Sequence, residues 1–226
     1  MDLLIFDLDG TLIDSKLDLA HAVNATRRHF NLPPLDTELI STYVGNGAPV
    51  LMRRALPEAS EEELAGALQY FLAYYKDHAV ENTRPYAGIP EALSQLAAAG
   101  LLMAVLTNKP DAVSRHILEQ LNLAPYFARI YGGNSFENKK PHPAGVHKLL
   151  EELGVAADRT MLVGDSAVDV RTARNAGIRV CGVTYGFQPD SFREHPPDMM
   201  VDRPEALVRA VIAERKARGI TGSYDV

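Results

Sequence analysis

The sequence predicts an α/β protein in which a Rossmann-like, doubly wound parallel sheet carries an inserted helical cap domain. Two observations predict the sheet: apolar runs alternate with helical patterns, and polar residues follow several of these runs. Between Asp14 and about Asn82 the alternation stops, because helical patterns occur there without any strand. We therefore expect residues 1–13 and 83–226 to form the core and residues 14–82 to form the cap.

Five apolar runs are expected to form the sheet, near residues 3–7, 102–106, 128–131, 160–164 and 179–183. In the cap, apolar residues from Leu64 to Tyr75 recur at spacings of three and four, which predicts an amphipathic helix. The linkers near residues 13–16 and 82–86 are expected to act as hinges. The tail from Arg218 onward is expected to fray.

Length, charge and composition are those of an ordinary globular protein. With 226 residues, of which 46% are hydrophobic, the chain can bury a substantial core. A formal net charge of −6 argues against a nucleic-acid partner, which would need a basic surface. The single cysteine, Cys181, excludes an internal disulfide, and no apolar run approaches the roughly 20 residues of a membrane span. We expect a soluble cytoplasmic protein without a membrane partner, either a monomer or a homodimer.

The first strand ends in two aspartates that are followed by a glycine turn, in the sequence Asp7-Leu8-Asp9-Gly10-Thr11. Because the chain turns at the end of a strand, we expect Asp7 and Asp9 to be exposed there and to reach one pocket. An aspartate nucleophile typically forms an aspartyl phosphate, and a second acid beside it can transfer protons. Asp7 and Asp9 are therefore candidate catalytic residues.

Two later motifs offer groups that suit a phosphate. Thr107 and Asn108 follow the second core strand just before a helix, where short donors and the helix dipole favour an anion. Lys140 precedes Pro141 and Pro143, which stiffen the loop and fix the direction of the lysine. Thr107, Asn108 and Lys140 are therefore candidate substrate-binding residues.

The fourth motif is a strand that ends at Gly164, followed by Asp165 and, four residues later, Asp169. Side chains at i and i+4 share one face of a helix, so we expect both acids to face a common cation. An acid in a first helical turn also stabilises the helix dipole, and this alternative stays open for Asp169. Together with Asp7 and Asp9, these acids form an oxygen-rich set that suits Mg²⁺.

The four motifs, in this order, resemble those of phosphatases in the haloacid dehalogenase superfamily. The resemblance implies a Mg²⁺-dependent phosphomonoester hydrolase that forms an aspartyl phosphate on Asp7. It also implies that Asp7 and Asp165 bind the metal through their side chains and Asp9 through its backbone carbonyl. Lys140 would hold the nucleophile and the phosphoryl group by charge, and Thr107 would complete the catalytic set.

The cap contains a glycine-flanked turn, Gly45-Asn46-Gly47, before a helix, and such a turn can offer backbone donors to a small carboxylate. From the residues alone, a plain turn between helices is an equally good interpretation. The stretch from Thr42 to Ala48 also resembles the cap loop of bacterial phosphoglycolate phosphatases. That resemblance implies 2-phosphoglycolate as the substrate and Gly45, Asn46 and Gly47 as substrate-binding residues.

Other functions stay open on the same motifs. Pyrophosphatases and sugar-phosphate phosphatases of this architecture share all four of them. A non-catalytic regulator that senses phosphate is opposed by the intact acidic set, and a metal-dependent nuclease is opposed by the acidic net charge. In the cap, Arg53 and Arg54 are expected on a solvated helix face, and Tyr75 in the cap core or on its surface.

Overall fold

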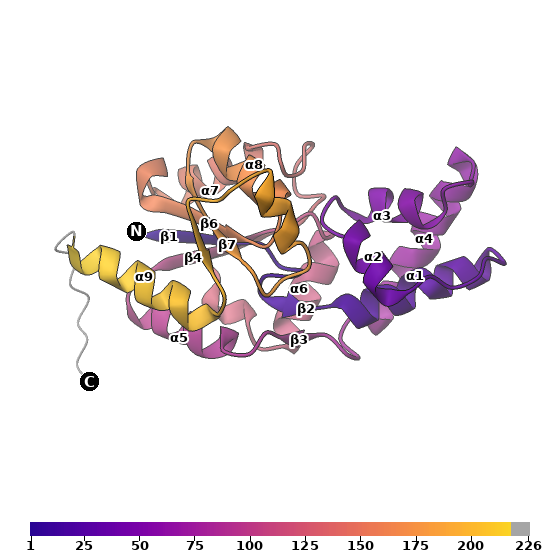
Figure 1. Ribbon diagram of the computed structural model, residues 1–226, viewed down its shortest axis with the longest axis horizontal. Helices are drawn as coiled ribbons and strands as arrows, with labels where there is room; N and C mark the ends of the chain where they lie inside the picture. The colour runs from indigo at the N-terminus through magenta and orange to yellow at the C-terminus, as the bar shows by residue number, and fades with distance from the viewer. Residues whose placement is uncertain (218–226) are drawn as a thin grey trace.

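The structure is a computed structural model that describes residues 1–217. Figure 1 shows a core built around a sheet on one side and a group of four helices on the other. Within the described residues, no helix combines the length and the hydrophobicity needed to cross a bilayer. The frayed tail expected from Arg218, and the end of the predicted core, lie outside the described residues.

The core contains a six-stranded parallel sheet with the order β5-β4-β1-β6-β7-β8. Its strands are β1 (Leu3–Phe6), β4 (Leu102–Leu106), β5 (Arg129–Tyr131), β6 (Thr160–Gly164), β7 (Arg179–Val183) and β8 (Met199–Val201). The five predicted strands are confirmed, and the edge strand β8 is a sixth strand that was not predicted. The order is that of a doubly wound sheet, and it reverses at β1.

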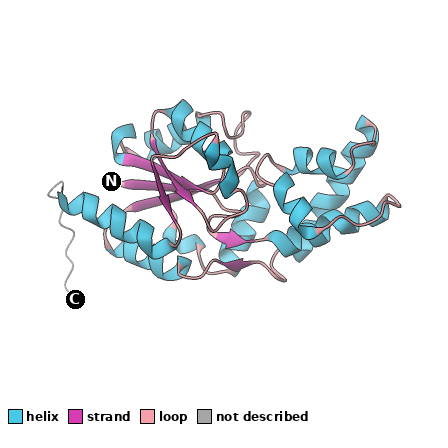
Figure 2. Ribbon diagram, in the orientation of Figure 1, coloured by secondary structure: helices cyan, strands magenta, loops and turns pink. Residues whose placement is uncertain are grey.

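Helices cover both faces of the sheet, as Figures 1 and 2 show. They are α5 (Ile89–Ala98), α6 (Asp111–Gln120), α7 (Ala144–Leu153), α8 (Ala167–Ala176) and α9 (Pro204–Ala217), with short 3₁₀ turns at Ala124–Tyr126, Ala157–Arg159 and Pro189–Arg193. Leu4 and Phe6 of β1 belong to a buried cluster with α5, α6 and α9. Leu3 and Ile5 belong to the cluster with α7 and α8 on the other face. Because successive strand residues alternate between faces, this central strand is apolar throughout.

The cap consists of α1 (Lys16–His29), α2 (Thr37–Tyr43), α3 (Ala48–Ala55) and α4 (Glu61–His78). In α4, Leu64, Phe71 and Tyr75 are buried, which confirms the predicted amphipathic helix. A capping box begins this helix: the Ser60 hydroxyl accepts from the Glu63 N–H, and the Glu63 carboxylate accepts from the Ser60 N–H. Helix α4 therefore begins at a defined point in the chain.

A two-stranded ribbon joins the cap to the core, where β2 (Ile13–Asp14) pairs antiparallel with β3 (Arg84–Pro85). Beside it, Asp18 in the first turn of α1 accepts hydrogen bonds of 2.8 to 3.0 Å from the backbone N–H groups of Asn82 and Thr83. Burial alone would raise the pKa of Asp18, but the hydrogen bonds from Asn82 and Thr83 lower it overall. We propose that this ribbon marks the boundary between core and cap and is the hinge about which the cap moves.

Candidate active site

The predicted motifs meet at the carboxyl edge of the sheet. Asp7 directly follows β1, between β4 and β6, at the point where the strand order reverses. Thr107 follows β4 and Asp165 follows β6, so strand ends place all three side chains at this edge. In open parallel sheets, ligands bind in the crevice beyond such a point.

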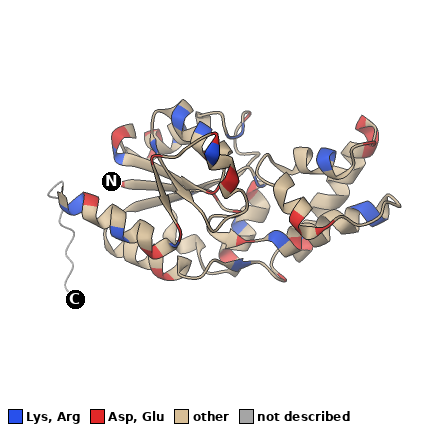
Figure 3. Cartoon of the chain, viewed as in Figure 1, with Lys and Arg blue, Asp and Glu red and all other residues tan. Residues whose placement is uncertain are grey.

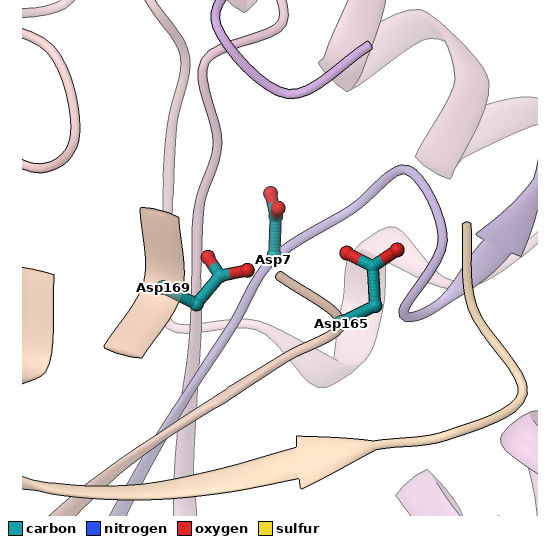
Figure 4. A group of neighbouring side chains, drawn as sticks. All are labelled: Asp7, Asp165 and Asp169. Carbon is teal, nitrogen blue, oxygen red and sulfur yellow. The ribbon is translucent and has the colours of Figure 1, made fainter. Parts of the chain in front are cut away.

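Three buried carboxylates form a cluster at this edge: Asp7, Asp165 and Asp169 (Figure 4). One oxygen atom from each lies within 4.8 Å of the other two. Figure 4 shows Asp7 between the other two, with all three carboxyl groups on the same side of the strand ends. The expectation that Asp7 is exposed is wrong, since it is only 7% exposed. The loops that meet here and the cap cover the end of its strand.

Glycine in the first motif allows the fourth motif to come close. Gly10 turns the chain after Asp9 with φ of 78°, a conformation that side chains other than glycine rarely adopt. A Cβ atom at this position would collide with the carboxylate of Asp165. The turn therefore brings Asp165 towards the two aspartates of the first motif.

Lys140 places a cation inside the carboxylate cluster. Its Nζ lies 3.0 Å from Oδ1 of Asp7 and 2.7 Å from Oδ1 of Asp169. Burial alone would lower the pKa of Lys140, but Asp169 and Asp7 raise it overall, so the side chain is charged. Asn108 holds the lysine backbone, because its Oδ1 accepts from the Lys140 N–H and its Nδ2 donates to the Lys140 carbonyl, each at 3.0 Å.

The cluster carries more negative than positive charge. Burial raises the pKa of Asp7 to about 6, although Lys140 opposes the shift and Asp169 adds to it. Burial also raises the pKa of Asp165 well above its ordinary value, and repulsion from Asp169 and Asp7 adds to the effect. A divalent cation would relieve this repulsion, and carboxylate oxygens are ligands that Mg²⁺ prefers. The residues present therefore fit a magnesium ion.

Asp165 and Asp169 converge, but not on one helical face as predicted. Helix α8 begins at Ala167 with Ser166 as its N-cap, so Asp165 precedes the helix. Asp169 accepts from the N–H and the hydroxyl of Ser166, which forms a capping box. Asp165 is instead held by the N–H of Phe187, which donates to Oδ2 at 2.6 Å. The Asp169 carboxylate therefore satisfies the backbone N–H of the N-cap Ser166, and the helix begins at the next residue, Ala167.

Asp9 is held by a lysine that the sequence reasoning did not select. Lys109 Nζ lies 2.9 Å from Oδ1 and 3.1 Å from Oδ2 of Asp9, and the Ser15 hydroxyl donates to Oδ1. Burial alone would lower the pKa of Lys109, but Asp9 and Tyr75 raise it overall. One signal pointed to this lysine: it follows Thr107 and Asn108 directly, within the second motif.

The same lysine contacts the cap. Lys109 Nζ donates to the Tyr75 hydroxyl at 2.6 Å and lies 4.5 Å from the centre of the tyrosine ring. Tyr75 belongs to α4 and was expected in the cap core or on its surface; it is buried and also lines the catalytic cavity described below. One side chain of the core therefore links Asp9 to the cap.

The two predicted phosphate donors of the second motif differ in how they are used. Thr107 is buried, and its hydroxyl accepts from the Lys109 N–H at 3.3 Å, which leaves the hydroxyl hydrogen available to a ligand. The Asn108 amide is already bonded to the backbone of Lys140 and, through Nδ2 at 2.9 Å, to the carbonyl of Gly45. The Asn108 side chain is therefore not a free donor, contrary to the prediction, but holds the lysine loop and the cap loop in place.

A cavity, called the catalytic cavity below, lies between these core residues and the cap. Its core wall includes Asp7, Asp9, Thr107, Lys109 and Asp165, and its cap wall includes Val44, Gly45, Gly47, Leu51, Phe71 and Tyr75. About 50 Å³ is open to the centre of a water-sized sphere. Asn46 is not among the lining residues, in contrast to Gly45 and Gly47. Arg53 pairs with Glu61 on the exposed surface, as expected.

The fold and this site define a class of enzyme. A doubly wound sheet with a helical cap, and an acidic cluster with a lysine at its carboxyl edge, agree with the model of the haloacid dehalogenase-like hydrolases, which matches residues 4–183. The chain belongs to this family and is a hydrolase. The family predicted from the four motifs is thereby confirmed.

Within the family, the chain is similar to phosphoglycolate phosphatases. It is 40% identical over 193 residues to that of Colwellia psychrerythraea, which covers 82% of this chain and 85% of the relative. It is 37% identical over 218 residues to the phosphoglycolate phosphatase of Vibrio cholerae, and this match covers 93% of this chain and 96% of the relative. The crystal structure of a predicted phosphoglycolate phosphatase from Haemophilus somnus matches with a TM-score of 0.89 and 34% identity, covering 93% of this chain and 97% of that one.

Proposed function

We propose that this protein is a Mg²⁺-dependent phosphomonoester hydrolase and that it converts 2-phosphoglycolate to glycolate and inorganic phosphate. The observation that carries the reaction is the carboxylate of Asp7, which is buried, held by Lys140 and close to Asp165. Similarity over most of the chain to proteins named phosphoglycolate phosphatase supports the substrate. The partner is thus a small phosphorylated metabolite.

In the first step, the Asp7 carboxylate attacks phosphorus. Oδ1 of Asp7 accepts from the Leu8 N–H at 2.7 Å and contacts Lys140, which leaves Oδ2 as the attacking oxygen. The bond from phosphorus to the ester oxygen breaks as the bond to Asp7 forms. The departing alkoxide takes a proton from the Asp9 carboxyl group, and the product is glycolate beside an aspartyl phosphate.

In the second step, water attacks the phosphorus of the aspartyl phosphate. The Asp9 carboxylate accepts a proton from this water, and the bond between phosphorus and Asp7 breaks to release inorganic phosphate. Lys109 and Ser15 hold the Asp9 side chain in place for both transfers. Because Lys109 also bonds Tyr75 of the cap, the position of Asp9 is linked to closure of the cap.

Positive charge and hydrogen-bond donors hold the phosphoryl group. Lys140 and the Thr107 hydroxyl serve this role among the described side chains. Mg²⁺ would be held by the side chains of Asp7 and Asp165 and the backbone carbonyl of Asp9, and Asp169 lies close enough to contribute. The ion supplies charge that offsets repulsion between the nucleophile and the phosphate.

The size and the donors of the catalytic cavity support a small substrate that carries a carboxylate. A water molecule needs roughly 10–15 Å³ of such volume, so about 50 Å³ admits a group the size of glycolate more readily than a sugar. Helix α3 begins beside this cavity at Ala48, directly after its N-cap Gly47, and no side chain caps its first turn, where Ala48 and Val50 carry N–H groups and Pro49 has none. Those groups and the helix dipole suit the substrate carboxylate.

A comparison of kcat/KM values with Mg²⁺ tests this proposal. We expect 2-phosphoglycolate to exceed pyrophosphate, glucose 6-phosphate and p-nitrophenyl phosphate by about tenfold or more, and EDTA to abolish turnover. Asp7→Asn should abolish turnover while its circular dichroism stays unchanged. A higher kcat/KM for pyrophosphate or a sugar phosphate than for 2-phosphoglycolate would overturn the proposed substrate. Full activity of Asp7→Asn in EDTA would refute the mechanism. Phosphate binding without any turnover would favour a sensor instead.

A further inference from the structure

The cap contains a second cavity, of about 420 Å³, that shares no lining residue with the catalytic cavity. It lies where α1, α2 and α3 end and α4 begins; Figure 1 labels these four helices. Small-molecule sites typically span roughly 300–1,000 Å³, so this cavity is of suitable size. Most of its wall is apolar, but it includes two arginines; the lining residues that matter here are Phe30, Leu32, Leu35, Leu56, Arg27 and Arg54.

Arg27 is a buried cation that forms no ion pair with any carboxylate of residues 1–217. It is 7% exposed, its Nε donates to the Pro33 carbonyl at 2.6 Å, and its Nη1 donates to the Ala55 carbonyl. Burial lowers the pKa of Arg27, as expected for a charge that has lost water without gaining a counter-charge. The other buried cations of the described residues each contact an aspartate: Lys109, Lys140 and Arg215.

Arg54 brings a second guanidinium to the same cavity. Its Nη1 donates to the carbonyl of Tyr43, the last residue of α2, at 3.1 Å. Two acidic residues, Glu58 and Glu63, also line the cavity; like Arg54 they are exposed to solvent, and Glu63 is bonded to Ser60. Solvent screens the charges of these three exposed side chains much more than that of the buried Arg27 guanidinium. The interior of the cavity therefore favours an anion.

We propose that this cavity binds a small organic anion with an apolar body, such as an aromatic or branched aliphatic carboxylate. The anionic group lies beside Arg27, whose Nη2 has no acceptor among the described residues. The apolar body packs against Phe30 and Leu35. A charge-assisted hydrogen bond to a buried guanidinium is stronger than a neutral one, so both parts of the ligand contribute to binding.

The position of the second cavity indicates that its ligand is an effector. Arg54 holds the carbonyl of Tyr43, and the next residue, Val44, accepts from Nε2 of Gln188 in the core at 2.7 Å. Val44 and Gln188 both line the catalytic cavity. A ligand that shifts Arg54 thus acts on the loop that closes over the substrate. By linkage, substrate and effector change each other's affinity by the same factor.

Benzoate is the probe for this site, and its binding is followed by backbone ¹H–¹⁵N NMR in saturating Mg²⁺ and inorganic phosphate. Because phosphate already occupies the catalytic anion site, saturable chemical-shift changes caused by benzoate report binding in the cap. We expect the largest chemical-shift changes at residues around Leu35 and Ala59. Benzyl alcohol, which carries no charge, should bind at least about tenfold more weakly than benzoate. Arg54→Gln should weaken benzoate binding about fivefold or more, whereas Arg53→Gln, its exposed neighbour outside the cavity, should change it less than about twofold.

Two further variants complete the test. Ala59→Phe fills the second cavity and should abolish benzoate binding, because Ala59 is part of its wall. Arg27→Met should also abolish benzoate binding. If Arg27→Met does not fold, the result for Arg54→Gln tests the proposal instead. The proposal fails if benzoate shows no saturable binding up to about 50 mM, a limit well above ordinary weak affinities. It also fails if benzyl alcohol binds as tightly as benzoate. A third contradicting result is an equal change in benzoate affinity in Arg54→Gln and Arg53→Gln.

Discussion

Two buried lysines each hold one of the proposed catalytic aspartates. Lys140 lies 3.0 Å from Asp7, and Lys109 lies 2.9 Å from Asp9. A buried charge without a partner is costly, so each lysine and its aspartate depend on each other. Their roles differ, because Lys140 contacts other core residues whereas Lys109 is also bonded to Tyr75 in the cap. The first pair is therefore built into the core, and the second responds to the cap.

At the residue scale, we predict that Mg²⁺ raises Tm more at about pH 7.5 than at about pH 5. Without metal, burial raises the pKa of Asp7 to about 6, against 3.8 for an ordinary aspartate. Between these values the folded state binds the extra proton, so metal-free stability falls as the pH rises through this window. Above it the carboxylate is ionised and ready to bind metal. The rise in Tm should be several degrees at the higher pH and markedly smaller at the lower.

Differential scanning calorimetry at both pH values, with and without Mg²⁺, measures this effect. Asp165→Asn serves as the matched variant, because it removes one carboxylate of the cluster and should lose most of the rise at the higher pH. An equal rise in Tm at both pH values would contradict the proposed metal site, as would an undiminished rise in Asp165→Asn.

At the scale of elements, the loop between α2 and α3 connects the cap to the catalytic loops. The Gly45 carbonyl accepts from Asn108 at 2.9 Å. Gly47 has φ of 87°, and a Cβ atom there would lie 3.1 Å from Lys139 Nζ and 3.3 Å from the Asn108 carbonyl oxygen. The two glycines thus let the cap backbone approach the core closely enough to shape the catalytic cavity.

We predict that Gly47→Ala lowers kcat/KM for 2-phosphoglycolate by about tenfold, because the added methyl group pushes the loop away from the core. Gly100→Ala is the control: Gly100 has φ of 71°, but a Cβ atom there meets nothing within 4 Å. Gly47 has φ of 87° and ψ of 164°, a conformation essentially restricted to glycine, so Gly47→Ala adds backbone strain in the cap loop to the contact with the core. Equal losses of kcat/KM in the two variants would show that the cap loop does not shape the site.

The sequence predicted the elements and motifs that depend on local order along the chain. The apolar run before Asp7 and the one before Asp165 mark strand ends, and a parallel sheet brings such ends together. Contacts between segments that lie far apart along the chain leave no such pattern in the sequence. The bond between Lys109 and Asp9 joins residues 100 positions apart, and nothing in the spacing distinguishes it from other lysine contacts. The start of α8 was misjudged for a local reason, since Ser166 competes for the N-cap.

For the whole molecule, the core supplies the proposed chemistry and the cap encloses it. Figure 3 shows basic and acidic residues interspersed over both parts. Attraction for an anionic substrate therefore rests on local groups such as the buried Lys140. The cap carries both the loop that lines the catalytic cavity and the second cavity, so substrate choice and the proposed regulation share one structural unit.

The central claim is that Asp7 becomes phosphorylated during turnover. Rapid-mixing kinetics of Asp9→Asn with p-nitrophenyl phosphate and Mg²⁺ test it most directly. Nitrophenolate leaves without needing a proton, so the first step proceeds, whereas the second step lacks its base. We predict a burst of nitrophenolate of about one equivalent per active site, followed by slow steady turnover.

The trapped species should carry phosphate on the peptide that contains Asp7, and hydroxylamine should remove it. The double variant Asp7→Asn, Asp9→Asn should show neither burst nor label. The result that contradicts this account is turnover without any burst in Asp9→Asn, with phosphate found on another residue or on none, while Asp7→Asn retains activity comparable to the unmodified enzyme.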